Sequence, residues 1–248
     1  MAISGVGLSS NISSTPAVQG GVGPDSQNPL STLQSKEKSA LTQLSAFGQV
    51  KSSLADLQNK AEALKSFSKP PTFSDFQVVV QGFVQSVNSL NKTVSALTSK
   101  QGVLNADSRS GQALNSVNKA IDGANGGGLS GLQKMGISQQ ANGTFSVNQK
   151  QLEKSFQDNR PGALSTICDL ANRVTQATDK QISSNGFIGK KVNDLSARVN
   201  DLENTRSTAQ GYLNTQKNTQ QFIAVQFPTV GGSTARNAVA AYSSIASL

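Results

Sequence analysis

Few residues in this chain could carry out catalysis or hold a metal ion. The 248 residues include no histidine, one cysteine (Cys168) and 14 acidic residues. Without histidine there is no Ser-His-Asp triad, no usual acid/base switch at neutral pH and no common zinc ligand. No stretch groups carboxylates with a nucleophile and a base. The sequence therefore predicts a protein that is not an enzyme and that needs no cofactor or metal.

The single cysteine cannot form a disulfide within the chain. Cys168 lies among Leu164, Ile167 and Leu170 at helical spacing. This pattern favours a small buried apolar side chain over a reactive thiol.

Two short motifs could be taken for binding or modification sites. The glycine-rich run 123–128 follows no predicted strand and precedes no Lys-Ser or Lys-Thr, so it does not indicate a phosphate-binding loop. Asn142-Gly143-Thr144 matches a glycosylation acceptor, but Asn-Gly is also the strongest short signal for a hairpin turn. A turn explains these residues without a further assumption.

The formal charge of +8 raises nucleic acid or an acidic surface as partners. However, the basic residues are scattered, only Lys190 and Lys191 are adjacent, and no aromatic residues alternate with them for base stacking. A solvated basic surface, or one that meets an acidic partner, accounts for the same charge. The sequence thus predicts no nucleic-acid partner.

The elements that organise the chain are two long, mostly polar helices. The first is predicted over 187–227, where apolar residues step alternately by four and three, as in a coiled-coil seam. The second is predicted over 30–68, with apolar residues at a seven-residue spacing. Each helix is too polar to be stable alone, so we expect the two to pair. The seam residues are Phe47, Leu54, Leu57 and Leu64 in 30–68, and Ile188, Val192, Leu195, Val199 and Leu202 in 187–227.

Residues 76–186 are predicted to form a helical core that contains one β-hairpin (132–148). Its main helix begins near Phe76, has a wide apolar face, and ends at Gly102. A shorter helix, 106–121, follows with Asp107 as its cap. The predicted strands are 132–140 and 144–148, and two further helices span 149–156 and 163–182. Ile137, Phe145 and Val147 are predicted to form the core of the hairpin by covering a helical face.

The two ends differ from the rest in composition. Segment 1–29 is rich in Gly, Ser, Pro and Asn, which predicts disorder, and it has neither basic residues nor an apolar run suited to a secretory signal or a membrane span. The C-terminal segment 228–248 begins with a break at Pro228–Gly232, and it is predicted to continue as a tail helix of small residues from Thr234 to Leu248. The fold class predicted for the whole chain is mainly α, an elongated helical bundle and coiled coil with one small hairpin.

Several stretches resemble the bacterial flagellar filament-capping proteins, the hook-associated protein 2 family. The most specific are Gly131–Ile137, Asn142–Asn148 and Asn159–Leu164, followed by a helix, a turn at Gly186 and a long helix. The stretches around Phe47 and from Phe83 to Leu90 are similar to other helices of that family. In the family a large β-rich insertion lies between these last two stretches. Here Ser68–Asp75 makes the whole connection, so the resemblance is to a reduced form without the outer domains.

The resemblance implies a structural protein of the bacterial flagellum, exported through the type III apparatus and therefore secreted. Such a protein would form a homo-oligomeric ring of five or six copies at the filament tip and support flagellin assembly. Flagellin or hook-associated proteins, and an export chaperone, would be its partners, with neither nucleic acid nor membrane among them. A soluble type III secretion tip or another axial adaptor is an alternative, and a basic helical nucleic-acid-binding protein is a weaker one.

If the seam is the assembly contact, replacing Leu195 and Leu202 with Asp should abolish the oligomer. The seam lacks strong apolar residues between Arg206 and Gly211. There we expect the long helix to loosen or to meet a neighbouring subunit.

Overall fold

The computed structural model describes residues 29–66, 71–123 and 127–226. In this part of the chain there are seven helices and one two-stranded hairpin, which confirms the predicted mainly α fold with a small hairpin. The elements are α1 (Pro29–Ala63), α2 (Phe73–Thr98), α3 (Arg109–Asp122), α4 (Gly127–Lys134), β1 (Ile137–Gln139), β2 (Phe145–Val147), α5 (Gln149–Asp158), α6 (Arg160–Ile182) and α7 (Phe187–Gln226).

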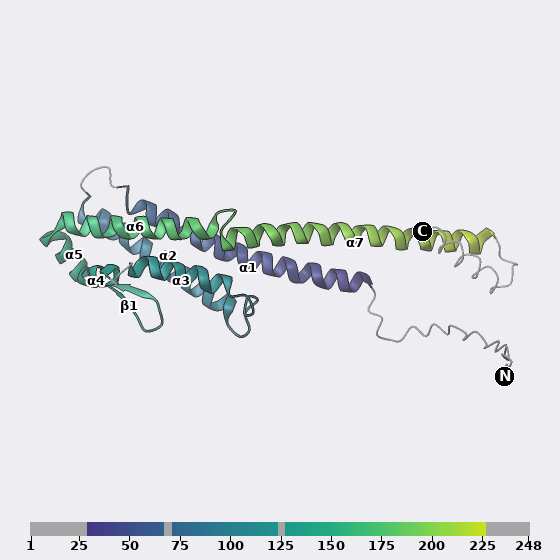
Figure 1. Ribbon diagram of the computed structural model, residues 1–248, viewed down its shortest axis with the longest axis horizontal. Coiled ribbons are helices and arrows are strands. Elements are labelled where there is room, and N and C mark those ends of the chain that lie inside the picture. Colours follow the sequence, from purple (N-terminus) through teal and green to yellow (C-terminus); the bar gives the residue numbers. More distant parts are fainter. Residues whose placement is uncertain (1–28, 67–70, 124–126, 227–248) are drawn as a thin grey trace, which may run out of the picture.

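Helix α1 lies at the centre of the arrangement and packs against α2, α6 and α7. Helices α6 and α7 follow one another along the long axis of the molecule, and α1 runs beside both of them (Figure 1). Glu37 near the start of α1 contacts Arg206 in the middle of α7, whereas Phe47 farther along α1 lies by Lys191 near the start of α7. The α1–α7 pair is therefore antiparallel, and it joins the first and last described helices.

One continuous apolar core connects the helices with the hairpin. Helix α2 contributes its wide apolar face, as predicted, since its side chains at three- and four-residue steps are buried. Burying a large aliphatic or aromatic side chain contributes about 1.5–3 kcal/mol. The largest fully buried side chains are Phe47, Leu54, Leu57, Leu64, Phe76, Leu90, Leu104, Ile121, Leu132, Leu152, Ile167 and Leu170.

Short polar signals fix where several helices begin. At the start of α2, Thr72 and Asp75 form a capping box in which each side chain bonds the other residue's backbone N–H. Asn148 caps α5 through Gln151 N–H, as the sequence predicted. Asn159 caps α6 through Gly162 N–H, so the predicted break 158–162 is much shorter than expected. Pro161 fits within the first turn, where its missing N–H has no helical partner to lose.

The prediction of a strand over 132–140 is wrong for its first part. Residues 127–134 form helix α4, and β1 begins only at Ile137. Leu129 and Leu132 are three positions apart, so one helical face brings both to the core. Gly136 then adopts a φ of +86°, which lets the chain turn directly from α4 into β1.

Two other helix boundaries also differ from the predicted ones. Helix α2 ends at Thr98, and Gly102 lies in the following turn, where its N–H bonds Ser99 O. Helix α3 begins at Arg109, and Asp107 lies just before it and accepts a bond from Arg109 N–H. The predicted disordered segment, except Pro29, and the predicted tail helix lie outside the described residues.

Candidate functional site

The seam between α1 and α7 is the most extensive contact between two elements of the described chain. Most of its predicted side chains are buried, and Val192 and Leu202 are half-buried. This burial occurs within one chain, and α1 shares its seam between two helices. Phe47 lies by Lys191 of α7. Gln58 bonds Asp179, and Leu64 O lies by Cys168 Sγ, so Leu57 and Leu64 lie beside α6 and not against α7 as predicted. The buried members are Phe47, Leu54, Leu57, Leu64, Ile188, Leu195 and Val199.

Polar contacts reinforce the two ends of this helix pair. Arg206 Nε donates to Glu37 Oε2 over 2.8 Å, and both side chains are mostly shielded from solvent. Nearer the start of α7, Lys191 Nζ lies 5.9 Å from the centre of the Phe47 ring and 3.9 Å from Asp107 Oδ2. The first ion pair fixes the register of α1 on α7 at the point where the apolar seam becomes weak.

The seam runs out after Arg206, but the helix does not break there. Helix α7 continues to Gln226, while every residue from Gln210 to Phe222 is exposed. Glu37 lies eight positions after Pro29, so in an antiparallel pair Pro29 lies opposite about residue 214. The last part of α7 therefore extends beyond the start of α1 (Figure 1).

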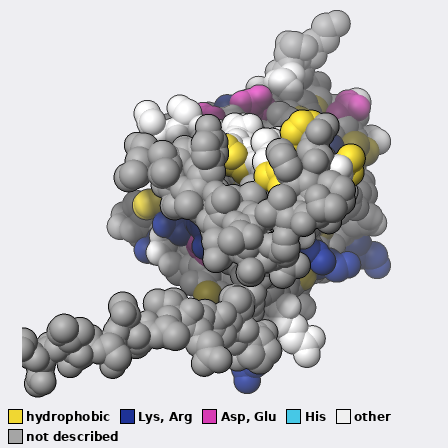
Figure 2. Space-filling view, turned by 90° about the vertical axis from the view of Figure 1, so that its right-hand side faces the viewer, with side chains coloured by type: hydrophobic (Ala, Val, Ile, Leu, Met, Phe, Trp, Pro, Cys, Tyr) yellow, Lys and Arg dark blue, Asp and Glu magenta, His cyan; other side chains and the backbone are white. Residues whose placement is uncertain are grey.

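This projecting end of α7, residues 212–226, carries large apolar side chains in solvent. Tyr212 is 73% exposed, Phe222 63% and Val225 77%, and Leu213 is also exposed. Figure 2 looks toward this end of the molecule, where several described apolar side chains are visible. Its only charged residue is Lys217. Such a surface is typical of a contact with another protein.

The hairpin is the second feature that the sequence singled out, and its predicted core residues do cover a helix. Ile137 and Phe145 are buried, and Val147 is half-buried against the core. The sequence did not reveal how α2 holds the hairpin. Asn88 Nδ2 donates to Phe145 O over 2.9 Å, and Asn88 Oδ1 accepts from Phe145 N–H over 2.7 Å.

Asn91, one turn farther along α2, donates to Gly143 O over 2.9 Å. The two asparagines thus bond the outer edge of β2 and its turn, where a third strand would otherwise pair. Their spacing of three positions on one edge of an amphipathic helix is the only signal that the sequence offers.

The described residues bring few reactive groups together. Among them, no three His, Cys, Asp or Glu side chains lie close enough to hold a metal ion. Cys168 is half-buried rather than buried as predicted, and its Sγ points to Leu64 O, 3.9 Å away. The buried face of α6 includes Ile167, Leu170 and Val174, and Cys168 lies at the edge of that face.

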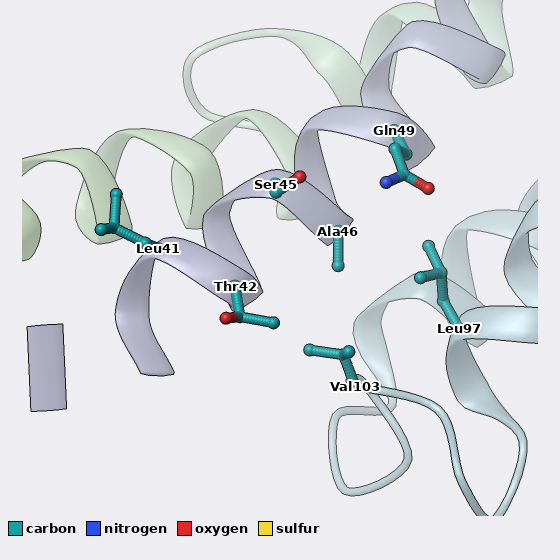
Figure 3. Close-up of a pocket in the computed structure, with 7 residues that line it drawn as sticks. All are labelled: Leu41, Thr42, Ser45, Ala46, Gln49, Leu97 and Val103. Carbon is teal, nitrogen blue, oxygen red and sulfur yellow. The ribbon is translucent and has the colours of Figure 1, made fainter. Parts of the chain in front are cut away.

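A shallow groove lies between the first half of α1, the end of α2 and the loop that follows α2 (Figure 3). No charged residue lines it. The lining residues are Leu41, Thr42, Ser45, Ala46, Gln49, Leu97 and Val103.

No protein-family model matches the chain, and no curated protein sequence matches it. Within the described residues, none of the helices has a stretch apolar and long enough to cross a bilayer.

Proposed function

We propose that this chain is a structural subunit of a homo-oligomeric assembly, and that the assembly is a cap-like axial component of the bacterial flagellum. The observation that carries the proposal is the form of α7. Its first half pairs with α1, and its last part projects with Tyr212 and Phe222 exposed. A protein of this kind acts through surfaces that hold neighbouring subunits, so it needs no reactive centre.

The flagellar part of this proposal is inferred from the sequence resemblance to the filament-capping proteins. Its most specific stretches, Gly131–Ile137 and Asn142–Asn148, coincide with the end of α4, the hairpin and the cap of α5. These segments are followed by α6, a turn at Ser183–Gly186 and the long α7. The order of elements is therefore consistent with the resemblance of the residues themselves. Secretion by type III export and support of flagellin assembly at the filament tip are further parts of the proposal and follow from the resemblance alone.

The fold changes how self-association has to be tested. Leu195 is buried against the core of its own chain and Leu202 is half-buried. An Asp at Leu195 would place an unpaired charge in the α1–α7 contact and destabilise the fold itself. Substitutions that probe assembly belong instead on the projecting end of α7.

Light scattering of the purified full chain tests the first part of the proposal. We expect a mass of five or six copies of the 25.8 kDa chain, and rings in negative-stain images. Phe222→Ser should lower the mass toward that of the monomer, because it removes an exposed aromatic anchor. Asn218→Ser, an exposed polar position on the same part of α7, is the matched control and should leave the mass unchanged. A monomer at every accessible concentration would contradict the proposal.

Deleting the coding sequence in the source organism tests the flagellar part. We expect short or absent filaments and unassembled flagellin in the medium, because flagellin exported to the growing tip would no longer be retained there. The wild-type chain and Asn218→Ser should restore filaments, and Phe222→Ser should not. Normal filaments in the deletion strain would reject the flagellar assignment while leaving the self-association unaffected.

A further inference from the structure

We propose that the projecting end of α7 in one copy docks into the groove between α1, α2 and the α2–α3 loop of the next copy. This inference rests on the homo-oligomeric function proposed above, and it assigns the two surfaces that meet. Both surfaces carry large exposed apolar side chains among uncharged polar ones, and both are formed by described residues.

The groove is shallow and open, and four of its seven lining residues are apolar. Its volume is about 380 Å³. Leu41 and Val103 stand at its rims with 46% and 45% of their surface exposed, and Ala46 is buried at its floor. In Figure 3, Val103 points across the gap toward Thr42, and Leu97 points toward Ala46. Exposed apolar side chains that gather around a groove are typical of an interaction site, whereas single ones are ordinary.

The projecting end of α7 matches the groove in charge. Residues 187–206 carry seven charged side chains, whereas residues 207–226 carry only Lys217. None of the groove residues is charged. The buried centre of a protein interface is depleted in charged residues and enriched in aromatic ones such as Tyr212 and Phe222. An uncharged helix that carries aromatic side chains therefore fits an uncharged groove better than it fits nucleic acid or an acidic surface.

The two surfaces of one chain cannot meet each other. Glu37 pairs with Arg206, so Leu41, one turn after Glu37, lies beside α7 near Leu202. Tyr212 and Phe222 lie ten and twenty positions farther along the same unbroken helix, or about 15 and 30 Å away along its axis. A continuous helix cannot fold back over that distance, so an α7 end that occupies the groove has to come from another copy.

The kind of assembly depends on how the contact repeats. Two copies that filled each other's grooves would form a closed pair. The ring proposed above requires the head-to-tail arrangement, in which each copy fills the groove of one neighbour and receives the α7 end of another. Repeated contacts of that type close into a ring or continue as a filament.

Site-directed cross-linking tests the contact. Cys168 is half-buried, and it is replaced by Ser so that only the introduced cysteines can react. Two full-length proteins in this background, Val103→Cys and Phe222→Cys, are mixed and treated with a short bismaleimide. We expect a covalent dimer in the mixture and little in either protein alone. Asn172→Cys, at an exposed position of α6, replaces Val103→Cys in the control mixture and should give no dimer with Phe222→Cys.

The outcomes separate this inference from the proposed function. If light scattering shows an oligomer but the Val103 and Phe222 positions do not cross-link, the docking is wrong and self-association stands. If Phe222→Cys alone cross-links as strongly as the mixture, the α7 ends pair with each other and the docking is also wrong. If the chain is a monomer, both proposals fail.

A matched pair of valines gives a second test without cysteines. Val103→Gln makes the rim of the groove polar, and Val78→Gln makes the same change at a 65%-exposed position of α2 outside both surfaces. Neither side chain belongs to the buried core, so both variants should fold with unchanged circular dichroism. We expect Val103→Gln to raise the protein concentration needed for oligomer formation at least tenfold, and Val78→Gln to leave that concentration unchanged. Equal behaviour of the two variants would overturn the docking.

Discussion

At the scale of single residues, Asn88 joins parts of the chain that are 57 positions apart. Its side-chain amide pairs with both backbone groups of Phe145, much as a residue of a neighbouring strand would. The Phe145 side chain is buried beneath the same contact. Asn88 therefore positions the hairpin on α2 and satisfies backbone groups that would otherwise be left without partners.

We expect Asn88→Ala to lower the free energy of unfolding by about 2 kcal/mol, because it leaves a shielded N–H and a shielded C=O unpaired. Urea denaturation measures the loss, and hydrogen exchange should show that the Phe145 amide loses protection. Asn115→Ala, at an exposed position of α3, is the control and should change stability by less than about 0.5 kcal/mol. Equal effects of the two variants would mean that the Asn88 bonds contribute nothing.

The Asp75 carboxylate gives a second residue-scale prediction, through pH. Its pKa is lowered from 3.8, first by the bond from the Thr72 hydroxyl and then by the bond from Thr72 N–H. A folded-state pKa below the unfolded one means that the stabilisation is present above pH 3.8 and is lost as the pH falls through the lower, folded value. The wild type should therefore be more stable than Asp75→Asn at pH 7, and the difference should shrink below pH 3.8.

Urea denaturation of both proteins at pH 7 and pH 3 checks this. Asp169→Asn serves as the control, since Asp169 is an exposed acid of α6 whose carboxylate forms no hydrogen bond or ion pair with another side chain of the described chain. A stability difference for Asp75→Asn that is independent of pH would show that the capping box does not depend on the charge of its carboxylate.

At the scale of elements, the junction between α6 and α7 depends on close backbone approach. A Cβ at Gly189 would collide with the carbonyl oxygens of Ile182 and Ser183 at the end of α6. Gly211, in the same helix, has open space around its Cα. The two glycines of α7 therefore have opposite roles, although both lie in a helix.

Replacing glycine with alanine should consequently change the stability in opposite directions at the two positions. Gly211→Ala should stabilise α7 by up to about 1 kcal/mol, because alanine has the higher helix propensity. Gly189→Ala should destabilise the protein by about 2 kcal/mol or more, because backbone atoms cannot move aside as a flexible side chain can. Thermal unfolding followed by circular dichroism measures both. A gain in stability at Gly189 would show that the junction between the helices is loose.

The elements also show what sequence patterns can and cannot predict. The seams predicted the two long helices and their pairing, because apolar residues at steps of three and four need a partner surface. The Asn142-Gly143 pair predicted the turn, and Gly143 indeed has a φ of +79°. Helix α4 was missed because its two core leucines follow glycines, which weaken the helical signal. Neither the Asn88 bonds nor the groove could be predicted, since both depend on which elements meet in space.

At the scale of the whole molecule, stability is distributed unevenly along α7. Its first part shares the core with α1 and α6, whereas in its last part every residue from Gln210 to Phe222 is exposed. Helices shorter than about 12–15 residues are marginal in water without tertiary contacts. The projecting end is therefore held by its continuity with the rest of α7 and by whatever covers it in the assembly.

Hydrogen exchange should reveal this uneven stability of α7 at a protein concentration low enough for light scattering to give the mass of a monomer. Amides near Leu195 and Val199 should exchange only when the whole protein unfolds, and amides from Tyr212 to Phe222 should exchange through local fraying. Leu195→Ala should speed the exchange of the amides near Leu195 and Val199, because it removes a buried side chain at a cost of about 2–5 kcal/mol. It should leave the exchange of the amides from Tyr212 to Phe222 unchanged, because their exchange does not require global unfolding.

Raising the concentration until the oligomer forms should then protect the amides from Tyr212 to Phe222 alone. Uniform protection along α7 in the monomer would show instead that the projecting end is stable without a partner, and it would remove the energetic reason for docking.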